Sequence, residues 1–550
     1  MSHDFSTHGW NPSRTSSGSP SKNHTMLPGL VILLAFGLCG SVQAETSKPR
    51  RPNVVLIMAD DLGYSDLGCY GGDIETPNLD RMAAEGMRFT QFYNCAVCRL
   101  SRASLMTGLH PRRADRSRLL HDNMTTVAEV ARSAGYRTSL TGKWHCPVTK
   151  PTDKNRLPTR RGFEEYYGLA AGCCNYFNPA KPFPENYGGQ GPEPFLNQES
   201  PVPKFPDDYY ATDAFSEHAV KQIEKFAGAE DGAPFFLHLC YTAPHYPLHA
   251  KPQDIAKYKG KYDDGYFAMR RKRHRRLVEL GLFDPRWKRS EPHPEVSKSR
   301  YDFAIIPWAK IDDGPREKRR MEVYAAMVDS MDQGIGRVLD ALDRTGAANN
   351  TLVMFLSDNG GCAGFLPNLD KELPGSIDTY DYVAQGWGWA QNAPFRRYKT
   401  WTHEGGISTP MIARWPGVTR PGSLTHQVGH VVDFMPTLLE VARAEYPENR
   451  NGVAVLPTDG LSLVPVLEGK ERASHESLCR YLYGNRAVRQ GKWKLVWGDN
   501  LRKWELFDME SDRTETNNLA ARYPGRVKQM QADWLRWAKE TGAPLKGTGI

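Results

Sequence analysis

Short apolar runs recur along this chain, and each ends abruptly in polar residues of reactive types. Four of them are Asn53–Ala59, Tyr136–Leu140, Pro234–Cys240 and Thr351–Leu356. Continuous apolar runs separated by helical patterns are typical of strands buried in a parallel sheet. The pattern predicts an α/β fold, with a large doubly wound sheet, mixed but mostly parallel, flanked by helices. Ligands in such folds gather beyond the carboxyl ends of the strands.

The segments between these runs predict helices. Thr76–Gly86 and Thr125–Gly135 each begin with threonine and close on glycine, which are common helix boundaries. Arg316–Gly346 carries an apolar stripe with a period of about 3.6 residues and leads into the strand at Thr351. A helix followed by a buried strand is the repeating unit of a doubly wound domain.

The pattern changes after about Val455. Short strand patterns follow at Ser477–Tyr483, Arg486–Gln490, Lys492–Trp497 and Trp504–Asp508, and an amphipathic helix at Arg522–Thr541. We predict a smaller C-terminal α+β domain over residues 456–550, an antiparallel sheet plus one helix. The main domain then spans residues 45–455.

The first residues read as an export signal. Lys22 and His24 precede the apolar run Leu27–Leu38, and Val42–Ala44 supplies a small-residue cleavage site. The run is shorter than the ~20 residues that span a bilayer. We therefore predict a cleavable signal peptide over residues 1–44, membrane contact only during export, and a periplasmic or extracellular location, or a lysosomal or secretory one in a eukaryote.

Composition narrows the functional classes. The 550 residues are 40% hydrophobic and 24% charged, which is enough for a large core, and the net charge of +8 gives no indication of nucleic-acid binding. Of ten cysteines, nine follow Cys39, and none of them forms the paired CxxC pattern of a zinc site. An odd number leaves at least one cysteine unpaired or chemically different in an oxidising compartment.

Two segments have open interpretations. The basic run Arg270–Arg276, inside an insertion from about Lys251 to Pro315, is either a solvated face or a dock for a polyanionic substrate. The stretch from Cys173 to about Asp208 is rich in Pro, Gly, Asn and aromatic residues, and we expect it to form a loop over the site.

Oxygen ligands follow two strands that we expect to be neighbours. Asp60 and Asp61 end one strand, and Asp358 and Asn359 end the other. Three crowded carboxylates repel one another unless a cation neutralises them, and an all-oxygen set suits Ca²⁺ or Mg²⁺. A single Asp pair at a strand end is more often a turn or a helix cap, but two such pairs favour a metal site.

A second constellation follows the strand pattern Met87–Tyr93. It contains Cys98, Arg102, Thr107 and Gly108 at the offsets of the signature Cys-x-Pro/Ser/Ala-x-Arg followed by Thr-Gly. Here the chain resembles the formylglycine-dependent sulfatases of the alkaline phosphatase superfamily, in the branch related to arylsulfatase A. Leu100 departs from the family pattern, because the third position usually holds Pro, Ser or Ala.

The resemblance extends from about Arg51 to Ala520. Ordered matches occur at Pro52–Tyr64, Thr76–Asp80, Gly142–His145, Arg161–Gly168, Ala243–Pro247, Ser357–Gly360, Tyr398–Gly406 and Glu505–Asp508.

By this resemblance, a separate formylglycine-generating enzyme oxidises Cys98 to Cα-formylglycine, whose aldehyde is hydrated to a geminal diol. One hydroxyl attacks the sulfur of a sulfate ester and displaces the alcohol, and deprotonation of the second hydroxyl then expels sulfate. The resemblance also implies a metal site, with Ca²⁺ favoured over Mg²⁺. Its ligands are Asp60, Asp61, Cys98, Asp358 and Asn359.

The family's catalytic roles carry over to five further positions. Arg102 fixes the formylglycine hydrate, and Lys143 neutralises it and binds sulfate. His145 hydrogen-bonds the diol and serves in sulfate release. His245 and Lys399 bind sulfate and assist the leaving oxygen, with His245 as the proton donor. General acid help of this kind is typically worth ~10²–10⁴-fold in rate.

The sequence leaves three alternative functions for this chain. The first is a sulfuric ester hydrolase acting on a sulfated polysaccharide or, slightly less favoured, an aryl sulfate. The second is a phosphate or phosphonate monoester hydrolase on the same scaffold, since the same groups would serve a phosphoryl transition state. The third is a silent sulfatase-like binding protein, in which Leu100 prevents conversion of Cys98.

Overall fold

The computed structural model describes residues 50–114, 120–146, 156–185, 194–292, 304–364, 371–499 and 501–545. The predicted signal peptide, residues 1–44, lies outside the described residues. The compact unit described below begins at Arg50.

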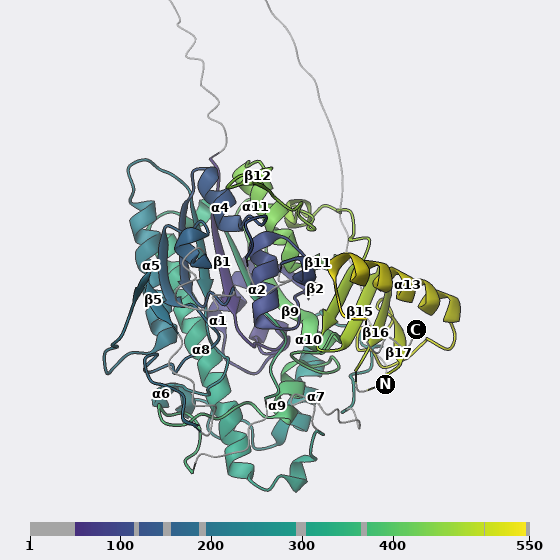
Figure 1. Ribbon diagram of the computed structural model, residues 1–550. Coiled ribbons are helices and arrows are strands. Elements are labelled where there is room, and N and C mark those ends of the chain that lie inside the picture. The colour runs from purple at the N-terminus through teal and green to yellow at the C-terminus, as the bar shows by residue number, and fades with distance from the viewer. Residues whose placement is uncertain are drawn as a thin grey trace, which may run out of the picture. The chain divides into compact units, whose positions relative to one another are not determined.

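An 11-stranded mixed sheet forms the centre of this unit (Figure 1). Its order is β10-β2-β9-β8-β1-β7-β3-β4-β5-β6, with β11 also paired to β2. The strands are β1 (Asn53–Ala59), β2 (Met87–Tyr93), β3 (Arg137–Gly142), β4 (Glu165–Leu169), β5 (Phe195–Asn197), β6 (Ser200–Pro201), β7 (Phe235–Cys240), β8 (Thr351–Ser357), β9 (Ser408–Arg414), β10 (Ser423–Thr425) and β11 (Gly429–His430). The central run β8-β1-β7-β3 is parallel, whereas β9 is antiparallel to both β8 and β2. The predicted mixed, mostly parallel sheet is confirmed.

Helices cover both faces of this sheet (Figure 1). The helices of the main unit are α1 (Pro77–Glu85), α2 (Cys98–Thr107), α3 (Pro111–Ala114), α4 (Val127–Ser133), α5 (Ala211–Ala227), α6 (Pro252–Ala256), α7 (Gly265–Glu279), α8 (Gly314–Arg344), α9 (Gln385–Gln391), α10 (Glu404–Ile407), α11 (Phe434–Ala442) and α12 (Val464–Leu467). One core cluster joins the sheet to α1, α5 and α8, and the other joins it to α2, α4 and α11.

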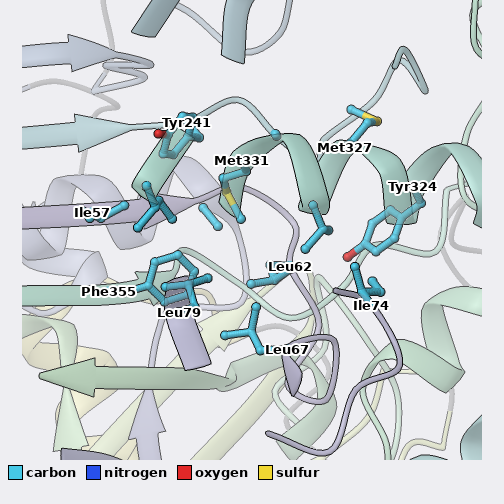
Figure 2. Packing of buried hydrophobic residues seen from close by; sticks show 14 of the residues in the cluster. Ile57, Leu62, Leu67, Ile74, Leu79, Tyr241, Tyr324, Met327, Met331 and Phe355 are labelled. Atoms are coloured by element: carbon cyan, nitrogen blue, oxygen red, sulfur yellow. The ribbon is translucent and has the colours of Figure 1, made fainter. Parts of the chain in front are cut away.

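Alternate residues of the central strands supply the two cores. Val55 and Ile57 belong to the first cluster, and Val54 and Leu56 to the second. Successive strand side chains point to opposite faces, so a continuous apolar run is what a sheet covered on both faces requires. Figure 2 shows the first cluster, in which Ile57 lies among side chains of α1 and α8. Burial of each such side chain contributes about 1.5–3 kcal/mol.

Local capping explains where two of the helices begin. The hydroxyl of Thr126 accepts from the Glu129 amide and the Glu129 carboxylate accepts from the Thr126 amide, a capping box at the start of α4. Asp313 accepts from the Arg316 amide, so α8 begins at Gly314, two residues before the predicted boundary.

A second, four-stranded sheet lies near the C-terminus, as predicted, and is antiparallel in the order β14-β15-β16-β17. Its elements are β14 (Leu478–Leu482), β15 (Asn485–Gln490), β16 (Trp493–Trp497), β17 (Trp504–Asp508) and the helix α13 (Pro524–Thr541) that packs on it. A small hairpin of β12 (Asn449–Arg450) and β13 (Val453–Ala454) precedes it.

The basic run lies on α7 and divides between two environments. Arg270 and Arg273 are buried, whereas Arg271, Lys272 and Arg275 are exposed. Arg270 donates to the carbonyls of Trp389 and Phe395 at 2.6 and 2.7 Å. Arg273 pairs with Asp66 and Asp73 at 2.5 and 2.6 Å. These two arginines are neither on a solvated face nor available to a polyanionic substrate, because backbone carbonyls and carboxylates within the fold bind their guanidinium groups.

Candidate active site

The carboxyl ends of four adjacent parallel strands meet at one edge of the main sheet. Polar residues predicted from the sequence follow all four strands: Asp60 and Asp61 after β1, Asp358 and Asn359 after β8, His245 after β7, and Lys143 and His145 after β3. Two further groups reach this edge from elsewhere, Cys98 and Arg102 on α2 and Lys399 in the loop before α10. The structure therefore brings the whole predicted set together.

Arg102 and Lys143 hold two of the carboxylates. Arg102 donates from Nε to Oδ2 of Asp358 at 2.9 Å, and its Nη2 lies 2.7 Å from the same oxygen. Its Nη1 donates to the Lys143 carbonyl at 2.8 Å. The ammonium of Lys143 pairs with Oδ2 of Asp60, and both side chains are fully buried.

Asp61 collects the remaining contacts. Its Oδ1 lies 2.5 Å from Nζ of Lys399 and accepts from Nδ2 of Asn359 at 2.6 Å. Its Oδ2 lies 3.6 Å from Nε2 of His245. Nδ1 of His245 donates to the Tyr246 carbonyl at 2.8 Å, which leaves Nε2 directed toward the carboxylates.

Cys98 is the first residue of α2 and is only 5% exposed. Two groups of three residues each bring one possible ligand atom per residue to within 4.8 Å of the others. The groups are Cys98, Asp60 and Asp358, and Asp60, Asp61 and His245. Oδ1 of Asp60 and Oδ1 of Asn359 are buried and have no hydrogen-bond partner among the described residues. Buried oxygens without partners are costly, so a divalent cation fits this donor set.

Burial and neighbouring charges shift the pKa values of these groups in opposite directions. Burial alone would raise the pKa of Asp60, but Lys143, His245 and Arg102 outweigh it and hold that pKa well below its ordinary value. Burial and the neighbouring Asp60 raise the pKa of Asp358 to about 7, despite Arg102.

The cations and the thiol respond to the same surroundings. Burial opposes the charge on Lys399, but Asp61 outweighs it and raises the pKa of this lysine well above its ordinary value. Burial raises the pKa of the Cys98 thiol and lowers the pKa values of His145 and His245.

Several residues that bear or flank the site groups have left-handed backbone conformations. The positive φ values are 66° at Asp61, 62° at Ala96, 44° at His145, 64° at Arg397 and 76° at Thr400. Such conformations are uncommon outside glycine, and for a β-branched residue such as Thr400 they are costly. Hydrogen bonds hold Thr400 in place: its amide donates to Ala96, and Nδ2 of Asn485 donates to its carbonyl at 3.2 Å.

Leu100, the departure from the signature, is 7% exposed and belongs to the second core cluster. Its side chain therefore packs inside the fold on the α2 face of the sheet.

Two features of the site were not found from the sequence. Cys362, partly exposed, lies beside Asp61, which together with burial raises the pKa of its thiol. Cys362 follows the predicted metal ligand Asp358 by four residues, and this short separation could have indicated that it lies near the site. Tyr246 stacks on Tyr382, and no sequence signal pairs two residues this far apart.

Comparison with known proteins decides the family. The model of the Sulfatase family matches residues 52–444, and the model described as N-sulphoglucosamine sulphohydrolase, C-terminal, matches residues 395–535. The chain belongs to the sulfatase family. It is thus a sulfuric ester hydrolase, and the resemblance recognised in the sequence is confirmed.

Curated sulfatases align with most of the chain. An arylsulfatase from Klebsiella aerogenes is 32% identical over 82% of this chain and 98% of its own. An uncharacterized sulfatase from Schizosaccharomyces pombe is 31% identical over 91% of this chain and 95% of its own.

Solved sulfatase structures share the fold. Ps i-CgsB in complex with k-i-k-neocarrahexaose superposes with a TM-score of 0.65 at 26% identity, covering 89% of this chain and 93% of that one. Within the part of this sulfatase that the structure describes, no helix has the length and hydrophobicity needed to cross a membrane.

Proposed function

We propose that this sulfatase hydrolyses sulfate esters through a formylglycine made from Cys98, with a bound Ca²⁺ as its metal. The observation that carries the proposal is the composition of the cluster around Cys98. Three carboxylates, Asp60, Asp61 and Asp358, contact three cations. The cations are Arg102, Lys143 and Lys399. The formal charges of these six side chains cancel, so the cluster without a metal has no net charge that would attract a sulfate ester.

The metal ligands are the set predicted above: Asp60, Asp61, Asp358, Asn359 and the converted Cys98. The two buried oxygens without partners, on Asp60 and Asn359, support this assignment. Oxygen donors favour Ca²⁺ or Mg²⁺, and a large, flexible ligand set favours Ca²⁺. A divalent cation would raise the formal charge of the cluster from zero to +2. It would polarise the nucleophile and attract the sulfate ester, which is a monoanion.

The other side chains of this chain have separate tasks. Arg102 fixes the position of residue 98 and of Asp358, to which it donates. Lys143 and Lys399, held in ion pairs with Asp60 and Asp61, bind sulfate oxygens. His245 gives a proton to the leaving oxygen from Nε2, and its bond to the Tyr246 carbonyl fixes that orientation. His145 takes a proton during sulfate release.

The substrate class and biological setting follow from the same assignment. Ps i-CgsB, 26% identical, was solved with k-i-k-neocarrahexaose, and an N-acetylgalactosamine-6-sulfatase from Mus musculus is 27% identical over 89% of this chain. We therefore favour a sulfated saccharide over a simple aryl sulfate. The proposal includes a formylglycine-generating enzyme as partner, an exported chain cleaved after residue 44, and domains at 45–455 and 456–550.

The test compares ester classes on protein made in a host with a formylglycine-generating system. We expect sulfate monoesters to be hydrolysed with at least a 100-fold higher kcat/KM, about 3 kcal/mol, than matched phosphate or phosphonate esters. Chelation should abolish turnover, and Ca²⁺ should restore it better than Mg²⁺. A preference for phosphorus esters, or turnover unchanged in Cys98→Ala, would overturn the assignment.

A further inference from the structure

An aromatic cluster adjoins the proposed proton donor. Tyr246 directly follows His245, and its ring stacks on Tyr382 with centroids 3.7 Å apart and planes 9° from parallel. Phe183 contacts both Tyr246 and Tyr380, with centroids 5.9 and 5.3 Å apart. The cluster is thus built from the segment after β7, the loop after β4 and the segment before α9.

The loop after β4 links this cluster to the other histidine of the site. A Cβ on Gly172 would lie 3.6 Å from the imidazole of His145, and Cys173, the next residue, packs against the aromatic cluster. Asn175 donates to the Ile377 carbonyl and to the Tyr380 hydroxyl at 2.8 and 3.0 Å. The loop therefore ties His145 to the aromatic residues beside His245.

The residues around the buried nucleophile differ in their exposure to solvent. Cys98 is buried, whereas His145, His245, Gly172, Cys173 and Tyr382 are partly exposed. With His245 as proton donor, the leaving oxygen of a bound sulfate ester would lie at His245, and its alcohol would extend toward Tyr246, whose ring centroid lies 6.5 Å from that of His245. Tyr246 is covalently next to His245, and Tyr382 is the partly exposed member of the stacked pair.

We propose that Tyr382, backed by Tyr246, is the apolar wall of the leaving-group subsite and selects esters whose alcohol carries a pyranose or aryl ring. This inference rests on the proposed function at Cys98 and His245. A pyranose presents a face of C–H groups and an aryl group presents a π face, and both pack on a tyrosine ring. An acyclic alcohol has no such face, so it gains less from the wall.

The experiment compares three sulfate esters on the converted, calcium-loaded full chain: a methyl pyranoside 6-sulfate, 4-nitrophenyl sulfate and glycerol 1-sulfate. For Tyr382→Ala we expect KM for the two ring esters to rise about three- to tenfold with kcat little changed. Their kcat/KM relative to glycerol sulfate should fall by the same factor. Tyr382→Phe should retain the wild-type ratio. Tyr483→Ala, at a tyrosine 60% exposed in the turn after β14, is the matched control.

The results distinguish a role of Tyr382 in binding the ring from a general effect on catalysis or folding. An unchanged ratio in Tyr382→Ala, or an equal loss on all three esters, would overturn the proposal, the latter by showing a merely structural role. The larger effect on the pyranoside or on the aryl ester identifies which ring the wall receives. Calorimetry measures the affinity of the same esters for Cys98→Ala, with and without Tyr382→Ala. This comparison does not need turnover, so a failure of the proposed function is distinguished from a failure of the proposed wall.

Discussion

Individual ion pairs set the properties of the catalytic cluster. Lys399 contacts Asp61 at 2.5 Å and lies between Arg397 and Thr400, both of which have positive φ. Strained backbone on both sides of a buried lysine is typical of a residue held in place for function. The cluster is buried, so each cation in it acts on a bound anion more strongly than a surface cation does.

Replacing this lysine should damage chemistry more than folding. In Lys399→Met we expect kcat/KM for a sulfate ester to fall by about 10²–10³-fold, because a preorganised cation near the transition-state charge is lost. Steady-state kinetics on the metal-loaded protein measures the effect, and Lys503→Met, at an exposed position, serves as control. Activity within threefold of wild type would show that Lys399 does not contact the reacting group.

The sequence predicts where a residue lies when its position along the chain determines its position in space. Apolar runs that end at Asp60 and Asp358 place both carboxylates at one sheet edge, because parallel neighbours end together. The sequence could not say which cation pairs with which carboxylate, nor reveal the stack of Tyr246 on Tyr382. Those contacts arise from loops whose approach is decided by tertiary packing.

Among the elements, α7 shows most clearly what a hydrophobic pattern misses. Arg270 and Arg273 are three residues apart and therefore share one helix face, which is the buried one. A polarity pattern classes every arginine as exposed, although a guanidinium with enough partners can be buried. Strands β1, β2, β3, β7, β8 and β14 to β17 and the helices α1, α4, α8 and α13 were predicted to within a few residues, whereas the short strands β4 to β6 and the strands β9 to β13 were not predicted.

The two environments on α7 predict different stabilities. Arg273→Met removes the partner of Asp66, a fully buried carboxylate, so we expect the free energy of unfolding to fall by about 3–5 kcal/mol. Arg275→Met, on the exposed face of the same helix, should change it by less than about 0.5 kcal/mol. Urea unfolding of the two variants makes the comparison, and equal stabilities would refute the buried role of Arg273.

Across the whole molecule, buried polar contacts connect the C-terminal sheet to the large one. Lys494 of β16 contacts Glu404 of α10 and Glu515, at 2.8 and 2.7 Å, with all three side chains fully buried. Glu505 of β17 lies 3.0 Å from Arg396, three residues before Lys399. The sequence predicted the second sheet but not this attachment, because charged residues in short strands carry no signal of their partners.

The Glu505 contact predicts a pH-dependent contribution to stability. Burial alone would raise the pKa of Glu505, but His403 and Arg396 outweigh it and lower the pKa to about 2. The contact therefore stabilises the fold above the ordinary glutamate pKa near 4.5, and the contribution is lost as pH falls toward 2. Glu505→Gln should cost about 2–3 kcal/mol at pH 7 and much less near pH 2.

Denaturant unfolding of wild type and Glu505→Gln between pH 2.5 and 7 measures this window. Glu510→Gln, exposed in the turn after β17, controls for general acid effects. A stability difference that stays constant across the range would contradict the assigned pKa shift.

A peptide mass spectrum of the converted protein shows whether Cys98 becomes the formylglycine nucleophile. Trypsin releases Phe89–Arg99, which contains both Cys95 and Cys98. We expect a mass about 18 Da below that of the unmodified peptide, with the change localised to Cys98 and Cys95 unaltered. An unmodified Cys98 thiol in protein that still releases sulfate would contradict the formylglycine mechanism, and an unmodified thiol in inert protein would indicate that Leu100 prevents conversion.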